Sequence, residues 1–184
     1  YARAAADQEL GLRGGRAAAL LVLALPGSVY VYQGEELGLP EVTDLPDEAK
    51  LDPAFARSGV SRDGCRVPLP WSGDEPPYGF GPGGPRTWLP QPAGGPPLSV
   101  APQTGDDGSM LELYRAALRL RRSVSGDLTW LDTPDHDVLA FRRWQPVYDA
   151  SGKYLDTNSK LYIVDLANPD EPRIASTVIH DDVD

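Results

Sequence analysis

Two adjacent carboxylates, Glu35 and Glu36, could support acid–base chemistry if one were ionised and the other protonated. Neighbouring residues on an extended segment project to opposite sides, so these two side chains cannot face one reacting bond. We therefore interpret Glu35 and Glu36, together with Gln33, as residues that support nearby loops through hydrogen bonds.

A second group, Arg62, Asp63 and Arg66, brings guanidinium and carboxylate side chains together on one short segment. Guanidinium groups donate hydrogen bonds and carboxylates accept them, so a fixed loop that carries both can bind hydroxyl groups. An arginine here could also pair with a carboxylate of an active site and orient it. We predict that all three bind substrate. The alternative is an Arg–Asp clamp that only fixes the loop.

Metal ligands are suggested by residues 135–137 (DHD) and 180–182 (HDD). Neither cluster has a second histidine at helical or hairpin spacing, and both lie in acidic, turn-like sequence, so we expect solvated loops. Cys65 is the single cysteine, which excludes an internal disulfide, and no histidine near it in sequence supports a nucleophilic role. The sequence predicts no metal site and no cofactor.

The elements that would position these residues begin with residues 16–25 (RAAALLVLAL). They are apolar on every face and rich in Ala and Leu, which predicts a buried helix too short to cross a bilayer. After a turn at Pro26-Gly27, residues 28–32 (SVYVY) predict a strand covered on both sides, as in a parallel sheet. A buried helix followed by a buried strand is the repeating unit of an α/β barrel.

Residues 40–104 are crowded with Pro and Gly and show no helical or strand periodicity. Unfolded linkers are poor in aromatic residues, whereas this segment contains Trp71, Tyr78, Phe80 and Trp88, whose side chains favour burial. We predict a long ordered loop, of the kind that usually has a function.

A second helix is predicted to begin at Ser109, which stands at capping-box spacing from Glu112. Cations suit the last turn of a helix, where three arginines stand: Arg119, Arg121 and Arg122. Residues 138–142 (VLAFR) then predict the first strand of a β-rich region.

The 184 residues carry a formal net charge of −10, which argues against nucleic acid and anionic membranes as partners because both are polyanionic. A neutral or cationic small molecule fits better. A lone thiol suits a reducing cytoplasm, where we expect the protein. The chain opens at Tyr1 rather than Met and is shorter than the roughly 250 residues of a barrel enzyme, so we suspect an upstream truncation.

Residues 26–40 (PGSVYVYQGEELGLP) closely resemble the eighth barrel strand and following loop of the α-amylase superfamily, glycoside hydrolase family 13, in its α-glucosidase and oligo-1,6-glucosidase branch. Residues 62–71 (RDGCRVPLPW) resemble a loop beside the active-site mouth of these enzymes. Residues 78–85 and 111–122 resemble the next loop and the last barrel helix, and residues 138–142 resemble the start of the C-terminal β-sandwich.

The resemblance implies an α/β fold, the C-terminal part of a (β/α)8 TIM barrel followed by a β-rich segment. Residues 1–132 would form the end of the catalytic barrel, with its helix 7, strand 8, long loop and helix 8, and residues 133–184 the β-rich segment. It further implies an enzyme that hydrolyses α-glucosidic bonds of short oligosaccharides or disaccharides with retention, through an Asp nucleophile, a Glu acid/base and a second Asp.

We expect these three catalytic residues upstream of Tyr1, so this chain would contain none of them and would be inactive alone. Arg62 and Asp63 would lie on the aglycone side of the substrate. Trp71, Tyr78 and Phe80 could stack on sugar faces at an outer subsite, although for Trp71 packing under the loop is favoured.

Two alternatives stay open. A transglycosylating relative, of the sucrose isomerase or trehalose synthase type, shares this region. Residues 161–173 (LYIVDLANPDEPR) resemble instead one blade of an LVIVD-type β-propeller, and neither Ile nor Asn occurs before Asn158. The last forty or so residues could therefore differ in origin, with a junction near Trp144, and the chain would then belong to a noncatalytic binding or scaffold protein that is secreted.

We predict that the isolated chain is poorly soluble, because residues 20–25 and 29–32 would expose apolar surface to water without barrel neighbours. The measurement is the fraction of purified chain that stays monomeric in size-exclusion chromatography. A cooperative thermal transition of a pure monomer would contradict this expectation.

Overall fold

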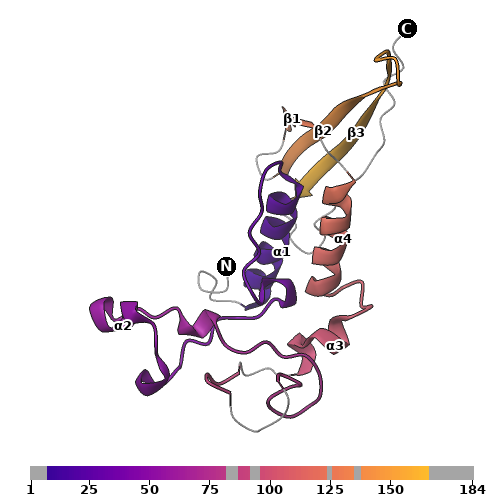
Figure 1. Ribbon diagram of the computed structural model, residues 1–184. Helices are drawn as coiled ribbons and strands as arrows, with labels where there is room; N and C mark the ends of the chain where they lie inside the picture. Colours follow the sequence, from indigo (N-terminus) through magenta and orange to yellow (C-terminus); the bar gives the residue numbers. More distant parts are fainter. Residues whose placement is uncertain (1–7, 82–86, 92–95, 124–125, 135–137, 166–184) are drawn as a thin grey trace. The chain divides into compact units, whose positions relative to one another are not determined.

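The computed structural model describes residues 8–81, 87–91, 96–123, 126–134 and 138–165 (Figure 1). The chain divides into two compact units, one formed by Gln8–Val29 with the chain from Tyr114 onward and the other by Tyr30–Leu113. The helices and strands are α1 (Gln8–Ala24), α2 (Pro53–Ser58), α3 (Val100–Gln103), α4 (Met110–Arg122), β1 (Asp127–Leu131), β2 (Val138–Tyr148) and β3 (Tyr154–Asp165). Short 3₁₀ helices stand at Glu35–Leu37, Asp47–Ala49, Asp63–Cys65 and Pro96–Leu98.

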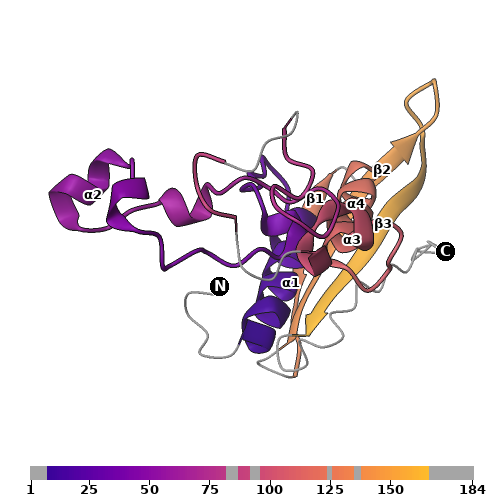
Figure 2. The same ribbon diagram turned by 90° about the horizontal axis from the view of Figure 1, so that it is seen from below.

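Helix α1 confirms the helix predicted from residues 16–25 and begins about two turns earlier, at Gln8. It packs beside α4 in both views (Figures 1 and 2), where Ala24 meets Phe141 of β2 and Leu120 of α4 contributes to the same cluster. The prediction that every face is buried is wrong. Val22 is half-exposed, because α4 and the sheet cover only one side of the helix in the described residues.

The carboxyl end of α1 is bound by Arg121 of α4. The guanidinium donates to the carbonyl oxygen of Leu23 over 2.7 Å and also to those of Leu25 and Gly27. The last carbonyls of a helix have no partner within it, and a cation suits the negative end of the dipole. Arg121 therefore serves the end of α1 as well as its own helix.

Strands β1, β2 and β3 form an antiparallel sheet in that order, in which Phe141 of β2 stands opposite Trp130 of β1 and Tyr162 of β3. The strand predicted at residues 138–142 is confirmed and continues to Tyr148, across Trp144 where the sequence suggested a junction. Strand β1 was not predicted. It lies before the expected domain boundary at residue 132, yet it pairs with β2, which lies after that boundary. The division into two domains stays a prediction.

The predicted buried parallel strand at residues 28–32 is wrong for this structure. None of these residues is in the sheet, and the side chain of Tyr30 is 92% exposed. A strand exists only where a neighbour takes its backbone hydrogen bonds, and the described residues offer none to this segment. The observed fold is thus mixed α and β with a small antiparallel sheet, without a parallel barrel sheet among the described residues.

The long loop predicted for residues 40–104 is ordered wherever it is described. It has a small core of its own, in which Leu45, Val67 and Leu89 are buried. Phe80 and Trp88 meet edge to face, with ring centroids 5.3 Å apart. The expected burial of the aromatic residues is wrong for Trp71, which is half-exposed, and for Trp88, which is 60% exposed.

Helix α4 begins at the predicted position, but its N-terminus forms only half of a capping box. The hydroxyl of Ser109 accepts from the backbone N–H of Glu112 over 3.1 Å, while the Glu112 carboxylate accepts from Gly105 rather than from Ser109. Buried Gln103 supplies a second acceptor, for the N–H of Leu111, and its amide group donates to the carbonyl of Leu37. A side chain from α3 therefore connects α4 to the 3₁₀ helix at Glu35–Leu37.

No helix among the described residues is long and apolar enough to cross a membrane.

Replacing Phe141 with Ala should destabilise the sheet and α1 by about 3–5 kcal/mol, because Phe141 is fully buried and its removal leaves a cavity. Urea unfolding of a protein that extends this chain upstream through a complete barrel measures the change in the free energy of unfolding. Val147→Ala, at a partly exposed position of the same strand, is the control and should cost less than about 1 kcal/mol. Equal effects of the two substitutions would show that Phe141 does not anchor this core.

Candidate functional site

The 3₁₀ helix at Glu35–Leu37 carries the two carboxylates that stand together in the sequence. Gly34 precedes it with φ of 90°, a left-handed conformation that favours glycine. Glu35 Oε2 accepts from the N–H of Tyr32 over 3.1 Å, and Glu36 Oε2 accepts from the N–H of Gly34 over 2.9 Å. Both carboxylates thus bind the backbone of their own turn, and their predicted part in supporting loops near an active site stays a prediction.

Gln33 supports a different part of the same unit. Its side-chain amide donates to the carbonyl of Val67 over 3.3 Å, and so links the turn to the segment that follows Arg66. This contact joins the two sequence regions in which the candidate residues lie. The loop-supporting role predicted for Gln33 has a direct structural counterpart here, while its part in a functional site stays a prediction.

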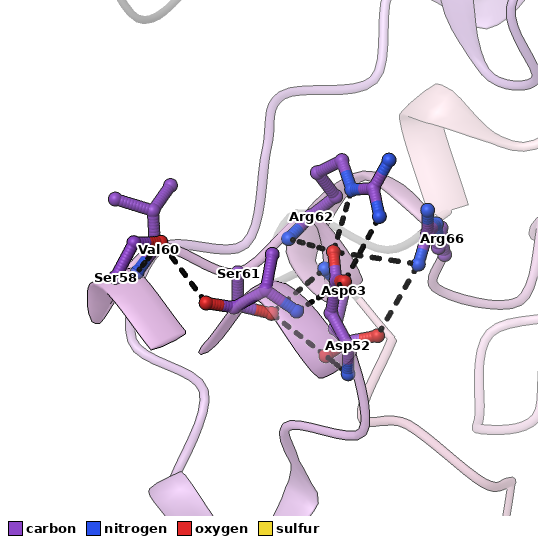
Figure 3. A network of polar contacts seen from close by, with 8 residues as sticks. Asp52, Ser58, Val60, Ser61, Arg62, Asp63 and Arg66 are labelled. Atoms are coloured by element: carbon purple, nitrogen blue, oxygen red, sulfur yellow. Dashed lines mark hydrogen bonds and ion pairs between the residues drawn. The ribbon is translucent and has the colours of Figure 1, made fainter. Parts of the chain in front are cut away.

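The centre of the candidate site is Asp52, a residue that sequence reasoning did not select. Its side chain is fully buried at the N-terminus of α2 (Figure 3). Asp52 Oδ2 accepts from Arg62 Nε over 2.6 Å, and Oδ1 accepts from Arg62 Nη2 over 2.9 Å. This bidentate pair is the strongest geometry that an arginine and a carboxylate can form.

Backbone donors complete the surroundings of Asp52. The N–H of Ala54 donates to Oδ1 over 3.0 Å, which caps α2, and the N–H of Arg62 donates to Oδ2 over 3.1 Å. A buried carboxylate requires donors of this kind, because burial without partners costs several kcal/mol. Asp52 therefore fixes the beginning of α2 and the loop at Arg62 together.

Asp63 is the second carboxylate of the cluster and is itself nearly buried. Its Oδ2 accepts from the hydroxyl of Ser61 over 2.7 Å and from the N–H of Asp52 over 2.8 Å. Arg66 lies between the two acids, with Nη1 3.6 Å from Asp52 Oδ2 and 3.8 Å from Asp63 Oδ1. The structure thus brings the three predicted substrate-binding residues together around Asp52, and their role in binding stays a prediction.

The electrostatics of the cluster keep both acids ionised. Hydrogen bonds from the Arg62 side chain, followed by that from the Ala54 N–H, hold the pKa of Asp52 far below its usual 3.8. The Ser61 hydroxyl is the largest cause that lowers the pKa of Asp63, and Asp52 raises the pKa of Arg62. The cluster carries two anions and two cations over a wide pH range.

Gly64 allows the loop at residues 62–66 to lie close to the backbone of Val42. A Cβ atom at this position would lie 2.2 Å from the carbonyl oxygen of Val42, so only glycine fits. The backbone of Gly64 instead accepts from the N–H of Val42 over 3.1 Å. The turn at residues 63–65 (Asp-Gly-Cys) therefore contacts the backbone at Val42 closely.

Other candidates lie apart from the cluster or outside the described residues. Trp71 and Tyr78 meet through the backbone, where Trp71 N–H donates to Tyr78 O over 2.7 Å, and a stacking role for them and for Phe80 stays a prediction. Residues 135–137 and 180–182, and the tail from residue 166, are outside the described residues. Among the described residues, no three His, Cys, Asp or Glu side chains gather as a metal site would require.

A signal for Asp52 was present in the sequence. Asp52 precedes Pro53, and an acidic residue before a proline marks a helix start, with the carboxylate as its cap. That pattern predicts a cap but not the pair with Arg62, ten residues later along an irregular path.

The pH dependence of stability should reveal the charge on Asp52. Because its folded pKa is lowered, the charge stabilises the fold fully above about pH 4, and this contribution is lost as the pH falls through the folded pKa. In a protein that extends this chain upstream through a complete barrel, we expect the wild type to melt at a higher temperature than the Asp52→Asn variant at pH 6, and the difference to shrink steadily toward pH 2. A difference that is independent of pH would contradict an ionised, paired Asp52.

Comparison with known proteins shows which family this chain resembles in sequence. Residues 1–127 match the sequence model of the alpha-amylase family, described as "Alpha amylase, catalytic domain". A probable alpha-glucosidase of Rhizobium meliloti (strain 1021) is 38% identical over 122 residues, 62% of this chain and 21% of that protein. Maltase 1 of Drosophila virilis is 34% identical over 110 residues, 56% of this chain and 17% of that protein. The chain thus spans about a fifth of the length of these relatives.

Solved structures agree with the sequence relatives. The alpha-glucosyl transfer enzyme XgtA superposes with a TM-score of 0.60 at 34% identity, over 81% of this chain and 27% of that one. The trehalulose synthase MutB from Pseudomonas mesoacidophila MX-45 superposes with a TM-score of 0.57 at 23% identity, over 84% of this chain and 30% of that one, which shows a shared fold. Because the family model covers residues 1–127, this chain belongs to the α-amylase family of glycoside hydrolases, as part of its catalytic domain.

Proposed function

We propose that this chain forms the closing part of the catalytic barrel of a retaining α-glucosidase that hydrolyses α-glucosidic bonds in disaccharides or short oligosaccharides. The observation that carries the proposal is the match of residues 1–127 to the catalytic domain, together with 38% identity to a probable alpha-glucosidase. Net charge agrees with it, since a chain of −10 favours a neutral substrate such as a sugar over a polyanion.

The reaction needs two carboxyl groups about 5–5.5 Å apart on opposite sides of the scissile bond. In this chain Glu35 and Glu36 bind backbone N–H groups of their own turn, and Asp52 and Asp63 are engaged by arginine and serine. Each of these four acids accepts at least one hydrogen bond within the chain, which favours a structural role for them. We therefore assign the catalytic carboxylates to sequence outside this chain and a substrate-binding part to the arginine loop.

A second candidate, transfer of the glucosyl group to an acceptor other than water, is favoured by the match to XgtA. Both reactions proceed through the same covalent glucosyl intermediate and differ in the acceptor that attacks it. MutB has been crystallised with sucrose, with isomaltulose and with glucose, which are ligands of that protein. Small glucosides are accordingly the substrates to test first.

We expect p-nitrophenyl α-glucoside to be hydrolysed by a protein that extends this chain upstream through a complete barrel, and not by this chain alone. The measurement is release of p-nitrophenol, with p-nitrophenyl β-glucoside as the control substrate. Proton NMR should show α-glucose as the first product, because retention preserves the anomer. Activity of this chain alone would contradict the assignment of the catalytic carboxylates elsewhere.

Maltose supplied with and without an added acceptor alcohol separates the two candidate reactions. Free glucose as the main product in both cases supports the hydrolase. A dominant glucosyl-acceptor product would instead support the transferase.

A further inference from the structure

Gln103 is a buried glutamine whose side chain bonds two segments that are far apart in the sequence. It stands at the end of α3, and 6% of its surface is exposed. Its Nε2 donates to the carbonyl oxygen of Leu37 over 3.0 Å, and its Oε1 accepts from the N–H of Leu111 over 3.1 Å. Both contacts lie within the unit formed by Tyr30–Leu113. The side-chain amide therefore connects the 3₁₀ helix at Glu35–Leu37 to the first turn of α4.

The two partners determine which way the amide of Gln103 points. A carbonyl oxygen only accepts and a backbone N–H only donates, so the amide nitrogen must face Leu37 and the amide oxygen must face Leu111. An ionised glutamate would present two acceptors, and a lysine would present donors only. A neutral amide satisfies both partners at once, which neither charged side chain can do.

The carbonyl of Leu37 needs a donor from outside its own turn. That turn uses the carbonyls of Gly34 and Glu35, which accept from the N–H groups of Leu37 and Gly38. The last carbonyls of a helical turn have no partner within it, and Leu37 is only 1% exposed. A buried carbonyl without a partner is costly, so the bond from Gln103 stabilises the turn in this position.

The end of α4 is held twice, because Ser109 assists Gln103. The hydroxyl of Ser109 donates to the backbone carbonyl of Gln103 over 2.9 Å and accepts from the N–H of Glu112 over 3.1 Å. The first N–H groups of a helix have no partner within it, and here Ser109 and the Gln103 side chain each supply one acceptor. A substitution that keeps an acceptor at position 103 should therefore leave the beginning of α4 in place.

We infer that Gln103 is a positioning residue, which holds the turn that carries Glu35 and Glu36 in its active arrangement by donating to the Leu37 carbonyl. The inference rests on the proposed glucosidase function. Barrel enzymes keep their chemistry at the carboxyl ends of the strands, and residues 26–40 resemble the last barrel strand with the loop that follows it. Gln103 acts through the backbone of Leu37 and needs no contact with the substrate.

The test uses the protein extended upstream through a complete barrel, with p-nitrophenyl α-glucoside as the substrate. Gln103→Glu keeps an acceptor for Leu111 but, when ionised, has no donor for Leu37. Burial raises the pKa of the new carboxyl, and so does the hydrogen bond that its neutral form donates to Leu37. We expect kcat/KM relative to the wild type to fall about tenfold at about pH 8, and to recover to within about twofold at about pH 5, where the protonated acid donates as the amide does.

Two further variants separate the bond to Leu37 from other effects. Gln103→Leu removes both side-chain bonds, and we expect its loss of kcat/KM to be the same at every pH. Gln145→Glu makes the same chemical change on β2, in the other compact unit, and should leave kcat/KM at the wild-type value. The segments around Gln103 carry four carboxylates that every variant retains: Glu35, Glu36, Asp106 and Glu112. The ratio to the wild type therefore isolates the change at position 103.

The outcomes that overturn the inference are distinct. A Gln103→Glu variant that melts at a lower temperature, but has the kcat/KM of the wild type while it is folded, would show a purely structural role. A loss of kcat/KM that does not change with pH would show that the missing donor to Leu37 is not its cause. Absence of a cooperative melting transition under the assay conditions would make Gln103 a residue required for folding. A wild type that hydrolyses no α-glucoside would remove the proposed function itself, and is recognised before any variant is compared.

Discussion

Buried polar groups need partners, and the unit formed by Tyr30–Leu113 supplies them with no sheet and only short helices among its described residues. Side chains do this instead. Asp52 accepts from two backbone N–H groups, Gln103 bonds both the Leu37 carbonyl and the Leu111 N–H, and Glu36 closes the turn at Gly34. These polar side chains each bond segments that are far apart in the sequence, so a change of one of them should alter several segments together.

The other unit solves the same problem with regular structure and one arginine. Strands β1 to β3 pair with one another, and Phe141 supplies the apolar contact with α1. At the end of α1, where backbone carbonyls have no partner in the helix, Arg121 donates to the carbonyls of Leu23, Leu25 and Gly27. The two units thus depend on arginines in different ways, since Arg121 completes a helix end while Arg62 is itself held in place by an acid.

The pair of Arg62 and Asp52 joins an exposed and a buried side chain: Arg62 is 63% exposed, whereas Asp52 is fully buried. The carboxylates of Glu35, Glu36 and Asp52 accept hydrogen bonds from backbone N–H groups and from arginine. The assignment of bond cleavage to residues outside this chain stays a proposal.

Sequence alone determined the local elements and the family. Composition and capping signals located α1, α4 and β2, and two long motifs indicated the α-amylase family. Tertiary structure decided which residues form hydrogen bonds across long separations in the sequence. Arg62 bonds Asp52 ten residues away, Gln103 bonds Leu37 66 residues away, and Arg121 bonds Leu23 98 residues away. It also left residues 28–32 outside the sheet, although their β-branched and aromatic side chains suit a strand. Helix periodicity and caps act over one or two turns and can be read locally, whereas a strand or a buried ion pair exists only where the path of the chain brings its partner within reach.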